Sequence, residues 1–233
     1  MNVINVREQG AAESAAHALQ KLFDKVNPRS VLFLVSGDSS LSVLDARRKW
    51  RLPKKMTLSL VDERLTADLS KRNWTPFAQT TLFKQARRSK KTFFNPLNRG
   101  LKKTDVYFGT FLKQWLSRNE NKEVVVLVGV GGDGHTGAIF PHKNKTRFKR
   151  DFLTERILAK AYTAQNAPVS KKRLTVTLSF IVQHADHVIV FAIGKEKDSI
   201  VAQVTKGKVF EHEMPAVALM KLPQTLLYTT IPR

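Results

Sequence analysis

Short apolar runs alternate along this chain with longer segments whose apolar residues recur at helical spacing. The clearest helical segment is Ala11–Val26, and Asn27 with Pro28 is expected to end it. Short apolar or alternating runs predict strands at Val31–Val35, Met56–Val61, Val124–Val128 and Val188–Ile193. Fully apolar runs of this length are typical of strands that are buried on both faces of a parallel sheet.

The remaining segments continue this alternation. Helices are predicted over 73–88, 106–118 and 199–206, and a helical stretch follows the first strand to about Lys49. Leu174–Leu178 is predicted to be a strand followed by a short helix to about Asp186, whereas Phe152–Leu158 fits either state. We therefore expect one α/β domain over residues 1–233, with a doubly wound, mostly parallel, Rossmann-like sheet flanked by helices.

Polar segments follow four of the predicted strands. SGDSS follows Val35, DER follows Val61, GVGGDGH follows Val128, and GKEK follows Ile193. In doubly wound sheets, ligands bind at the carboxyl ends of the strands. The four segments are therefore expected to meet in one pocket.

Composition narrows the chemistry available to the chain. It is 42% hydrophobic and 25% charged, which is ordinary for a globular protein, and it has no cysteine. Disulfides, thiolate metal sites and cysteine nucleophiles are therefore excluded. The sequence has no signal-peptide pattern and no apolar run of roughly 18 residues, so we expect a cytoplasmic protein without membrane contact. It has no cluster of residues at metal-ligand spacing, and we expect no metal and no cofactor.

The charge balance is strongly basic, with 40 Lys and Arg against 19 Asp and Glu, a net charge of +21. Such a chain attracts anions, including phosphorylated metabolites and nucleic acid, although a general bias toward Lys and Arg accounts for the excess equally well. The basic clusters lack the regularly interleaved aromatic residues that stack on bases. Nucleic-acid binding is therefore not expected, although the charge leaves it open. The sequence predicts no oligomeric state.

The segment Gly129–His135 carries the most specific chemical signal. Gly129–Gly134 matches the dinucleotide-binding pattern G-x-G-x-x-G, but Pro141 soon ends the helical pattern that follows, and Lys and Arg dominate the region near 150. The glycines alone could serve a tight turn. Asp133 could orient His135 or cap the following helix, and His135 could act as a general base near neutral pH or have a structural role.

The stretch VVLVGVGGDGHTGAIFPH resembles the signature of the 6-phosphogluconolactonase family, whose superfamily includes glucosamine-6-phosphate deaminases. LVSGDSS resembles the phosphate loop of that family, VDERLTADLSKRNW its D-E-R segment, and KKRLTVTLSFIVQHADHVIVFAIGKEK its segment from R-x-T to G-x-x-K. The ordered motifs run from about Ala11 to Val217. Ile139–Pro141 lacks the acid that follows the histidine in deaminases, and Arg64 stands where they tend to have Tyr. Both differences favour the lactonase branch.

The resemblance implies hydrolysis of 6-phosphoglucono-1,5-lactone to 6-phosphogluconate, without a cofactor. It implies that His135 is the general base that activates water and that Asp133 fixes its tautomer. Arg64 is expected near the lactone carbonyl or the product carboxylate, and could instead form an ordinary salt bridge. Asp62 is expected to position a sugar hydroxyl or Arg64.

For the substrate phosphate, the resemblance implies a site made by Gly37, Ser39, Ser40, Arg173 and Lys197. Ser39 and Ser40 are also good helix caps, and the two basic residues could be solvated surface charges.

The phosphate loop is the weakest match to the family, because Asp38 stands where glycine is usual. A carboxylate beside a phosphate repels it unless it turns away or caps the helix. Altered affinity, a different phosphosugar and lost activity are therefore all open outcomes. The alternative functions are a related sugar-phosphate isomerase or deaminase, and a non-enzymatic binder of phosphosugars or nucleic acid.

Overall fold

A computed structural model describes residues 1–206 and 209–230 and contains two β-sheets. The larger sheet has seven strands, and every neighbouring pair in it is parallel. Its order is β1 (Asn2–Asn5), β10 (Thr225–Thr229), β9 (His187–Ala192), β6 (Lys122–Gly129), β2 (Ser30–Val35), β3 (Lys55–Leu60) and β5 (Thr92–Phe93). The smaller sheet is antiparallel, in the order β4 (Asp62–Arg64), β8 (Lys172–Val176) and β7 (Ala159–Thr163).

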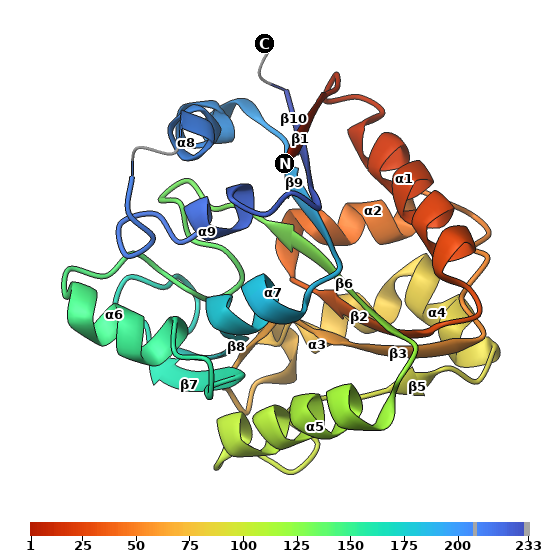
Figure 1. Ribbon diagram of the computed structural model, residues 1–233, viewed down its shortest axis with the longest axis horizontal. Coiled ribbons are helices and arrows are strands. Elements are labelled where there is room, and N and C mark those ends of the chain that lie inside the picture. The colour runs from red at the N-terminus through yellow and green to blue at the C-terminus, as the bar shows by residue number, and fades with distance from the viewer. Residues whose placement is uncertain (207–208, 231–233) are drawn as a thin grey trace.

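Helices cover both faces of the larger sheet (Figure 1). On one face pack α1 (Ala11–Val26), α2 (Leu41–Asp45), α3 (Trp74–Gln79) and α4 (Thr81–Arg88). On the other pack α5 (Thr104–Arg118), α7 (Leu178–His184), α8 (Lys195–Lys206) and α9 (Val217–Met220). Because successive strand residues point to opposite faces, Phe33 joins the first layer, whereas Leu32 and Leu34 join the second. The helix α6 (Lys145–Phe152) packs in a smaller cluster with part of α7.

The predicted doubly wound architecture is confirmed. The four strands predicted from apolar runs are β2, β3, β6 and β9, and they lie side by side within the sheet in the order β9-β6-β2-β3. The predicted helix Ala11–Val26 is α1 with the same bounds. The pattern gave no sign of β1, β5 and β10, because β1 and β5 have only four and two residues and the short apolar centre of β10 is flanked by Thr225 and Thr229.

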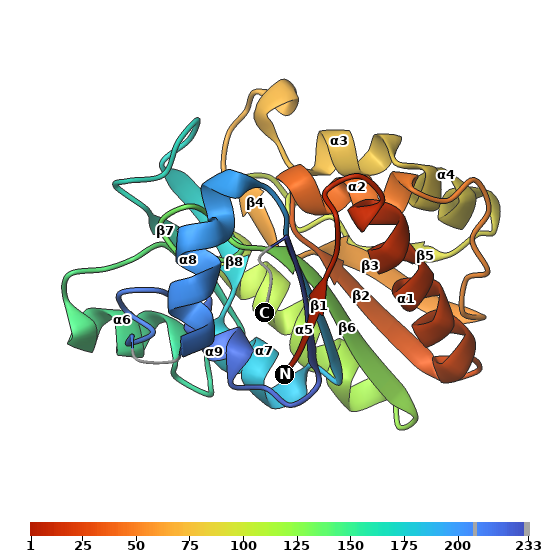
Figure 2. The same ribbon diagram turned by 90° about the horizontal axis from the view of Figure 1, so that it is seen from above.

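The strand predicted at Leu174–Leu178 is β8, but it belongs to the small antiparallel sheet (Figure 2). Alternation predicts an extended conformation and does not identify the neighbouring strand. The three strands β4, β7 and β8 lie on the side of the molecule away from α1 and α4. They thus extend the fold beyond the single sheet that we expected.

Several helix boundaries differ from those predicted. The helix predicted over 73–88 is divided at Thr80, which is extended (φ −64°, ψ 151°) and whose hydroxyl accepts a hydrogen bond from Phe83 N–H at 3.3 Å as the N-cap of α4. The stretch expected to reach Lys49 ends at Asp45, and α8 begins four residues before Ser199. A 3-10 turn over Asp38–Ser40, labelled η1, precedes α2.

Candidate active site

The carboxyl ends of β2, β3, β6 and β9 surround a cavity of about 210 Å³. Each of the four polar segments singled out in the sequence contributes to its wall. The lining residues are Ser36, Gly37, Asp38, Ser39, Asp62, Gly129, Val130, Gly131, His135, Gly137 and Lys197. The parallel sheet therefore brings together segments that are up to about 160 residues apart in the chain.

His135 ends a tight turn that follows β6. The turn is closed by hydrogen bonds from Gly134 N–H to Gly131 O and from Gly131 N–H to His135 O, both 2.9 Å. Asp133 Oδ1 accepts the His135 backbone N–H at 3.0 Å and lies 2.5 Å from His135 Nδ1. A carboxylate beside Nδ1 favours the tautomer with its proton there, and Nε2 is then the basic atom of the ring.

Two further neighbours fix the orientation of the His135 ring. It lies directly on Gly131, where an added Cβ would be 2.0 Å from His135 Cε1, so only glycine fits at this position. The Phe140 ring stacks on it with 4.4 Å between centroids. Partial burial raises the pKa of Asp133, but its hydrogen bond and charge interaction with His135 outweigh that effect and lower the pKa below the ordinary value. Asp133 therefore stays ionised beside the imidazole.

Asp62 is a buried carboxyl group in the same cavity, and Asn73 holds it in place. The Asn73 amide donates to Asp62 Oδ2 at 2.9 Å and to Asp62 O at 3.0 Å. Burial raises the pKa of Asp62 to about 7, with Glu63 and Asp38 adding to the rise and Arg173 and His135 opposing it. This carboxyl group therefore changes its protonation state near neutral pH.

Sequence reasoning missed Glu63 and Asn73 as supports of the site. The fully buried Glu63 carboxylate accepts backbone N–H groups from Arg64, Asn73 and Trp74 at 2.6–2.9 Å, which fastens β4 to the start of α3. The Asn73 side chain also touches Gly37, where a Cβ would be 2.8 Å away. Both residues lie in the D-E-R…N-W stretch that the sequence singled out, but the sequence did not show that they are buried, which is the basis of their role.

The serine hydroxyl groups of the turn Ser36–Ser40 have two different roles. Ser40 is fully buried, and its hydroxyl contacts Ser36 O at 2.8 Å and Gly37 O at 2.9 Å, so it shapes the turn. Ser39 faces the cavity, where Lys197 Nζ donates to its hydroxyl at 3.1 Å. Burial lowers the pKa of Lys197, although Glu196 and Asp38 oppose this. The structure thus places Ser39 and Lys197 in one wall.

Arg64 and Arg173 face each other across the β4–β8 pair, so their side chains share one face of the small sheet. Arg64 Nη2 lies 3.3 Å from Asp38 Oδ1, and Arg173 Nη2 donates to Pro168 O at 2.7 Å. Burial lowers the pKa of Arg173, an effect opposed by the nearby Asp62 carboxyl group. Within the described residues, the buried Nε atoms of both arginines have no hydrogen-bond partner.

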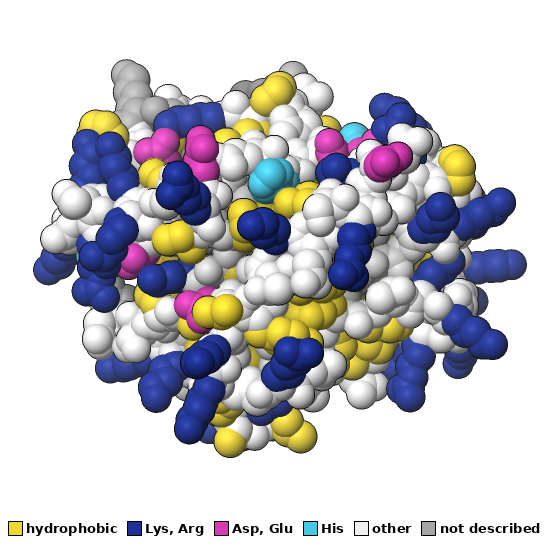
Figure 3. Space-filling model, turned by 60° about the horizontal axis from the view of Figure 1, so that its bottom comes forward, with side chains coloured by type: hydrophobic (Ala, Val, Ile, Leu, Met, Phe, Trp, Pro, Cys, Tyr) yellow, Lys and Arg dark blue, Asp and Glu magenta, His cyan; other side chains and the backbone are white. Residues whose placement is uncertain are grey.

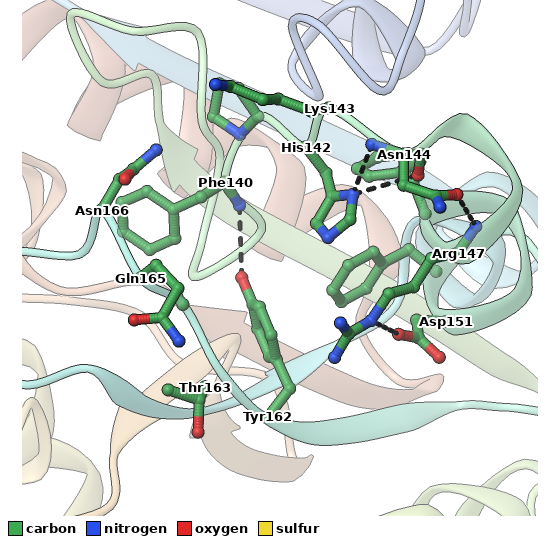
Figure 4. Close-up of a pocket in the computed structure, with 14 residues that line it drawn as sticks. Phe140, His142, Lys143, Asn144, Arg147, Asp151, Tyr162, Thr163, Gln165 and Asn166 are labelled. Atoms are coloured by element: carbon green, nitrogen blue, oxygen red, sulfur yellow. Dashed lines mark hydrogen bonds and ion pairs between the residues drawn. The ribbon is translucent and has the colours of Figure 1, made fainter.

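A second, larger cavity of about 390 Å³ lies beside Phe140 (Figure 4). The Tyr162 hydroxyl donates to Ala138 O at 2.6 Å and accepts the Phe140 N–H at 3.3 Å, which ties the loop to β7. His142 and Arg147 also line this cavity, but none of the predicted site residues does. Its volume alone therefore does not identify it as the catalytic centre.

In residues 1–206 and 209–230, no three His, Asp or Glu side chains are grouped so that they could hold a metal ion. No helix in the same ranges combines the length and apolar character needed to cross a bilayer.

The fold and the cavity define an α/β protein with a polar site at the carboxyl ends of its parallel strands, and comparison with known proteins places it in a family. The chain belongs to the family described as glucosamine-6-phosphate isomerases/6-phosphogluconolactonase, whose model matches residues 6–227. The 6-phosphogluconolactonase of Neisseria meningitidis is 26% identical over 211 residues, which cover 90% of this chain and 88% of that protein. The 6-phosphogluconolactonase of Rhizobium meliloti is 28% identical over 167 residues, covering 72% and 68%.

Solved structures show the same fold at lower identity. A 6-phosphogluconolactonase from Plasmodium vivax superposes with a TM-score of 0.76 at 16% identity, covering 97% of this chain and 89% of that one. A monomeric glucosamine-6-phosphate deaminase superposes with a TM-score of 0.67 at 17% identity, covering 98% and 97%. Because both branches of the family share this fold, the choice between them depends on the site.

Proposed function

We propose that this protein hydrolyses 6-phosphoglucono-1,5-lactone to 6-phosphogluconate, a step of the oxidative pentose phosphate pathway, in the cytoplasm. The observation that carries the proposal is His135, paired with Asp133 at 2.5 Å, on the wall of a cavity that Lys197 and residues 36–39 also line. A base and an anion-binding wall in one cavity suit an ester that carries a phosphate. The relatives named 6-phosphogluconolactonase support this choice of substrate.

In the proposed reaction, His135 Nε2 removes a proton from a water molecule as the water oxygen bonds to the lactone carbonyl carbon. The tetrahedral intermediate then collapses, the bond from that carbon to the ring oxygen breaks, and the imidazolium returns the proton to the ring oxygen. Asp133 stabilises the imidazolium in between. General base catalysis of this kind contributes about 10²–10⁴-fold.

We propose that Arg173 and Lys197 hold the phosphate with the Gly37–Ser39 backbone and the Ser39 hydroxyl. Ser40 acts indirectly by shaping the turn. Two guanidinium groups that face each other across paired strands repel each other unless an anion lies between them, so this pair favours an anionic ligand. Arg64, opposite Arg173 on this cationic face, contacts the phosphate as well and reaches toward the lactone end, where Asp62 positions a sugar hydroxyl or Arg64 itself.

A deaminase is the nearest alternative. The stretch after His135 reads Gly137–Pro141 without an acid, which leaves the deaminase branch without the carboxylate expected there. The other alternative is a protein that binds phosphosugars or nucleic acid without turning them over.

The test is turnover of fresh 6-phosphogluconolactone, compared with a buffer blank because this lactone also hydrolyses unaided. The proposal predicts a large acceleration and no release of ammonia from glucosamine 6-phosphate. Ammonia release without lactone hydrolysis would favour the deaminase. Phosphosugar binding without either reaction would favour the binder.

A further inference from the structure

Asp38 lies in the phosphate turn in an unusual conformation. Its φ of 56° lies in the left-handed region, where an L-residue other than Asn or Asp is rarely found. Its side chain is 83% exposed and lines the cavity, and its carboxylate Oδ1 lies 3.3 Å from Nη2 of Arg64, which is only 16% exposed. Asp adopts this conformation readily, so the feature to explain is the contact between its exposed carboxylate and a largely buried guanidinium group.

The Asp38 carboxylate does not have the ordinary structural role of a turn residue. In the described part of the chain, η1 and α2 begin without a side-chain cap, and the hydrogen bond of Asp38 goes to Arg64 instead. The bond crosses from the turn after β2 to β4, between residues 26 positions apart. Asp38 thus links two walls of the cavity through charge.

The charge of Asp38 also reaches the other groups of the site. It favours the protonated forms of Lys197 and Arg173, opposing the effect of burial on the pKa of each. It disfavours ionisation of Asp62, adding to the effect of burial on that pKa. The charge of Asp38 therefore acts on three other ionisable groups of the site, more weakly than burial does.

We propose that Asp38 is a specificity-determining residue that competes with the substrate phosphate for Arg64. In the free protein the Asp38 carboxylate is the anionic partner of Arg64, and phosphate binding requires Arg64 to exchange that carboxylate for a phosphate oxygen. The exposed side chain can turn toward solvent when this happens. The inference rests on the proposed function for the identity of the anion, and it predicts a phosphate site weakened by its own carboxylate.

Binding of inorganic phosphate, 6-phosphogluconate and gluconate, measured by calorimetry, tests the inference without turnover. Asp38→Asn keeps the size of the side chain, tolerates the left-handed backbone and removes the charge. We expect it to tighten binding of phosphate and of 6-phosphogluconate by about two- to fivefold, as for release of a partly exposed ion pair. Gluconate, which lacks the phosphate, should bind as it does to the wild type.

Asp24→Asn is the matched control. Asp24 lies on α1 and pairs with Arg51, so its substitution changes the net charge equally but away from the cavity. Unchanged or weaker phosphate binding by Asp38→Asn would overturn the inference. Equal tightening by Asp24→Asn, or tightening of gluconate binding alone, would also overturn it. So would a failure of every variant, and of the wild type, to bind phosphate. A wild type that binds 6-phosphogluconate without hydrolysing the lactone would overturn the proposed function alone.

Discussion

At the scale of the residue, the site shifts the pKa values of two carboxyl groups in opposite directions. Asp133 has a pKa below its ordinary value because His135 binds it, whereas burial raises the pKa of Asp62 to about 7. Divergent pKa values in one cavity are a feature of acid–base sites. In the proposed reaction, Asp133 supports the imidazolium and Asp62 contacts the sugar as a donor or an acceptor, depending on pH.

Asp62 should make stability depend on pH. Because its pKa rises from 3.8 to about 7 on folding, its contribution to stability is fully present below about pH 4 and is lost as pH rises toward 7. The Asp62→Asn variant has no carboxyl group to titrate at this position and keeps its stability where the wild type loses it. Between pH 4 and pH 8, the free energy of unfolding of the variant minus that of the wild type should therefore increase by up to about 4 kcal/mol. Urea denaturation across that range measures the difference. Parallel pH profiles for the two proteins would contradict the assignment.

The sequence predicts single residues best where a motif combines chemistry with spacing. Asp133 and His135 are close in sequence, and a turn two residues long forces them together, so their pairing could be expected. Glu63 and Asn73 could not be interpreted in this way, because their roles depend on burial and on contacts with backbone N–H groups 10 or 11 residues away. A charged residue gives no sign in sequence that it will be buried.

At the scale of the element, the strand ends were predictable and the small sheet was not. Apolar runs predict β2, β3, β6 and β9, and the parallel arrangement then brings their polar continuations to one edge. The three residues of β4 pair with β8, about 110 positions later in the chain, and no local pattern encodes that pairing. Yet this pairing sets Arg64 beside Arg173.

The β4–β8 pairing makes Arg173 a test of the phosphate site. Arg173→Ala should raise KM for 6-phosphogluconolactone about 10- to 100-fold, the range expected for loss of a charged hydrogen bond, with a smaller change in kcat. Lys172→Ala is the control, because the neighbouring side chain is exposed on the same strand. Steady-state kinetics with both variants measure the effect, and an unchanged KM in Arg173→Ala would remove this arginine from the phosphate site.

At the scale of the whole molecule, the net charge of +21 comes from basic residues distributed along the whole sequence. Figure 3 shows Lys and Arg side chains dispersed over the face in view, with few Asp and Glu among them. A dispersed positive charge raises the local concentration of small anions without forming one stripe for a nucleic-acid backbone. The charge therefore fits attraction of an anionic substrate at least as well as nucleic-acid binding.

This attraction should depend on salt. We expect kcat/KM for 6-phosphogluconolactone to fall severalfold as NaCl rises from about 50 to 300 mM, because salt screens exposed charges. Turnover of uncharged gluconolactone, measured in parallel, should change little. A phosphorylated substrate with no salt dependence would show that the net charge does not assist its capture.

We propose that His135, held by Asp133 at the end of β6, activates the water that opens the lactone. The most direct test of this proposal is the hydrolysis rate of fresh 6-phosphogluconolactone with wild type, His135→Ala and His17→Ala, each corrected for the buffer blank. His17 is exposed on α1 and serves as the matched control. We predict a loss of about 10²–10⁴-fold for His135→Ala alone, with 6-phosphogluconate binding retained. A folded His135→Ala protein with the wild-type rate would contradict the account.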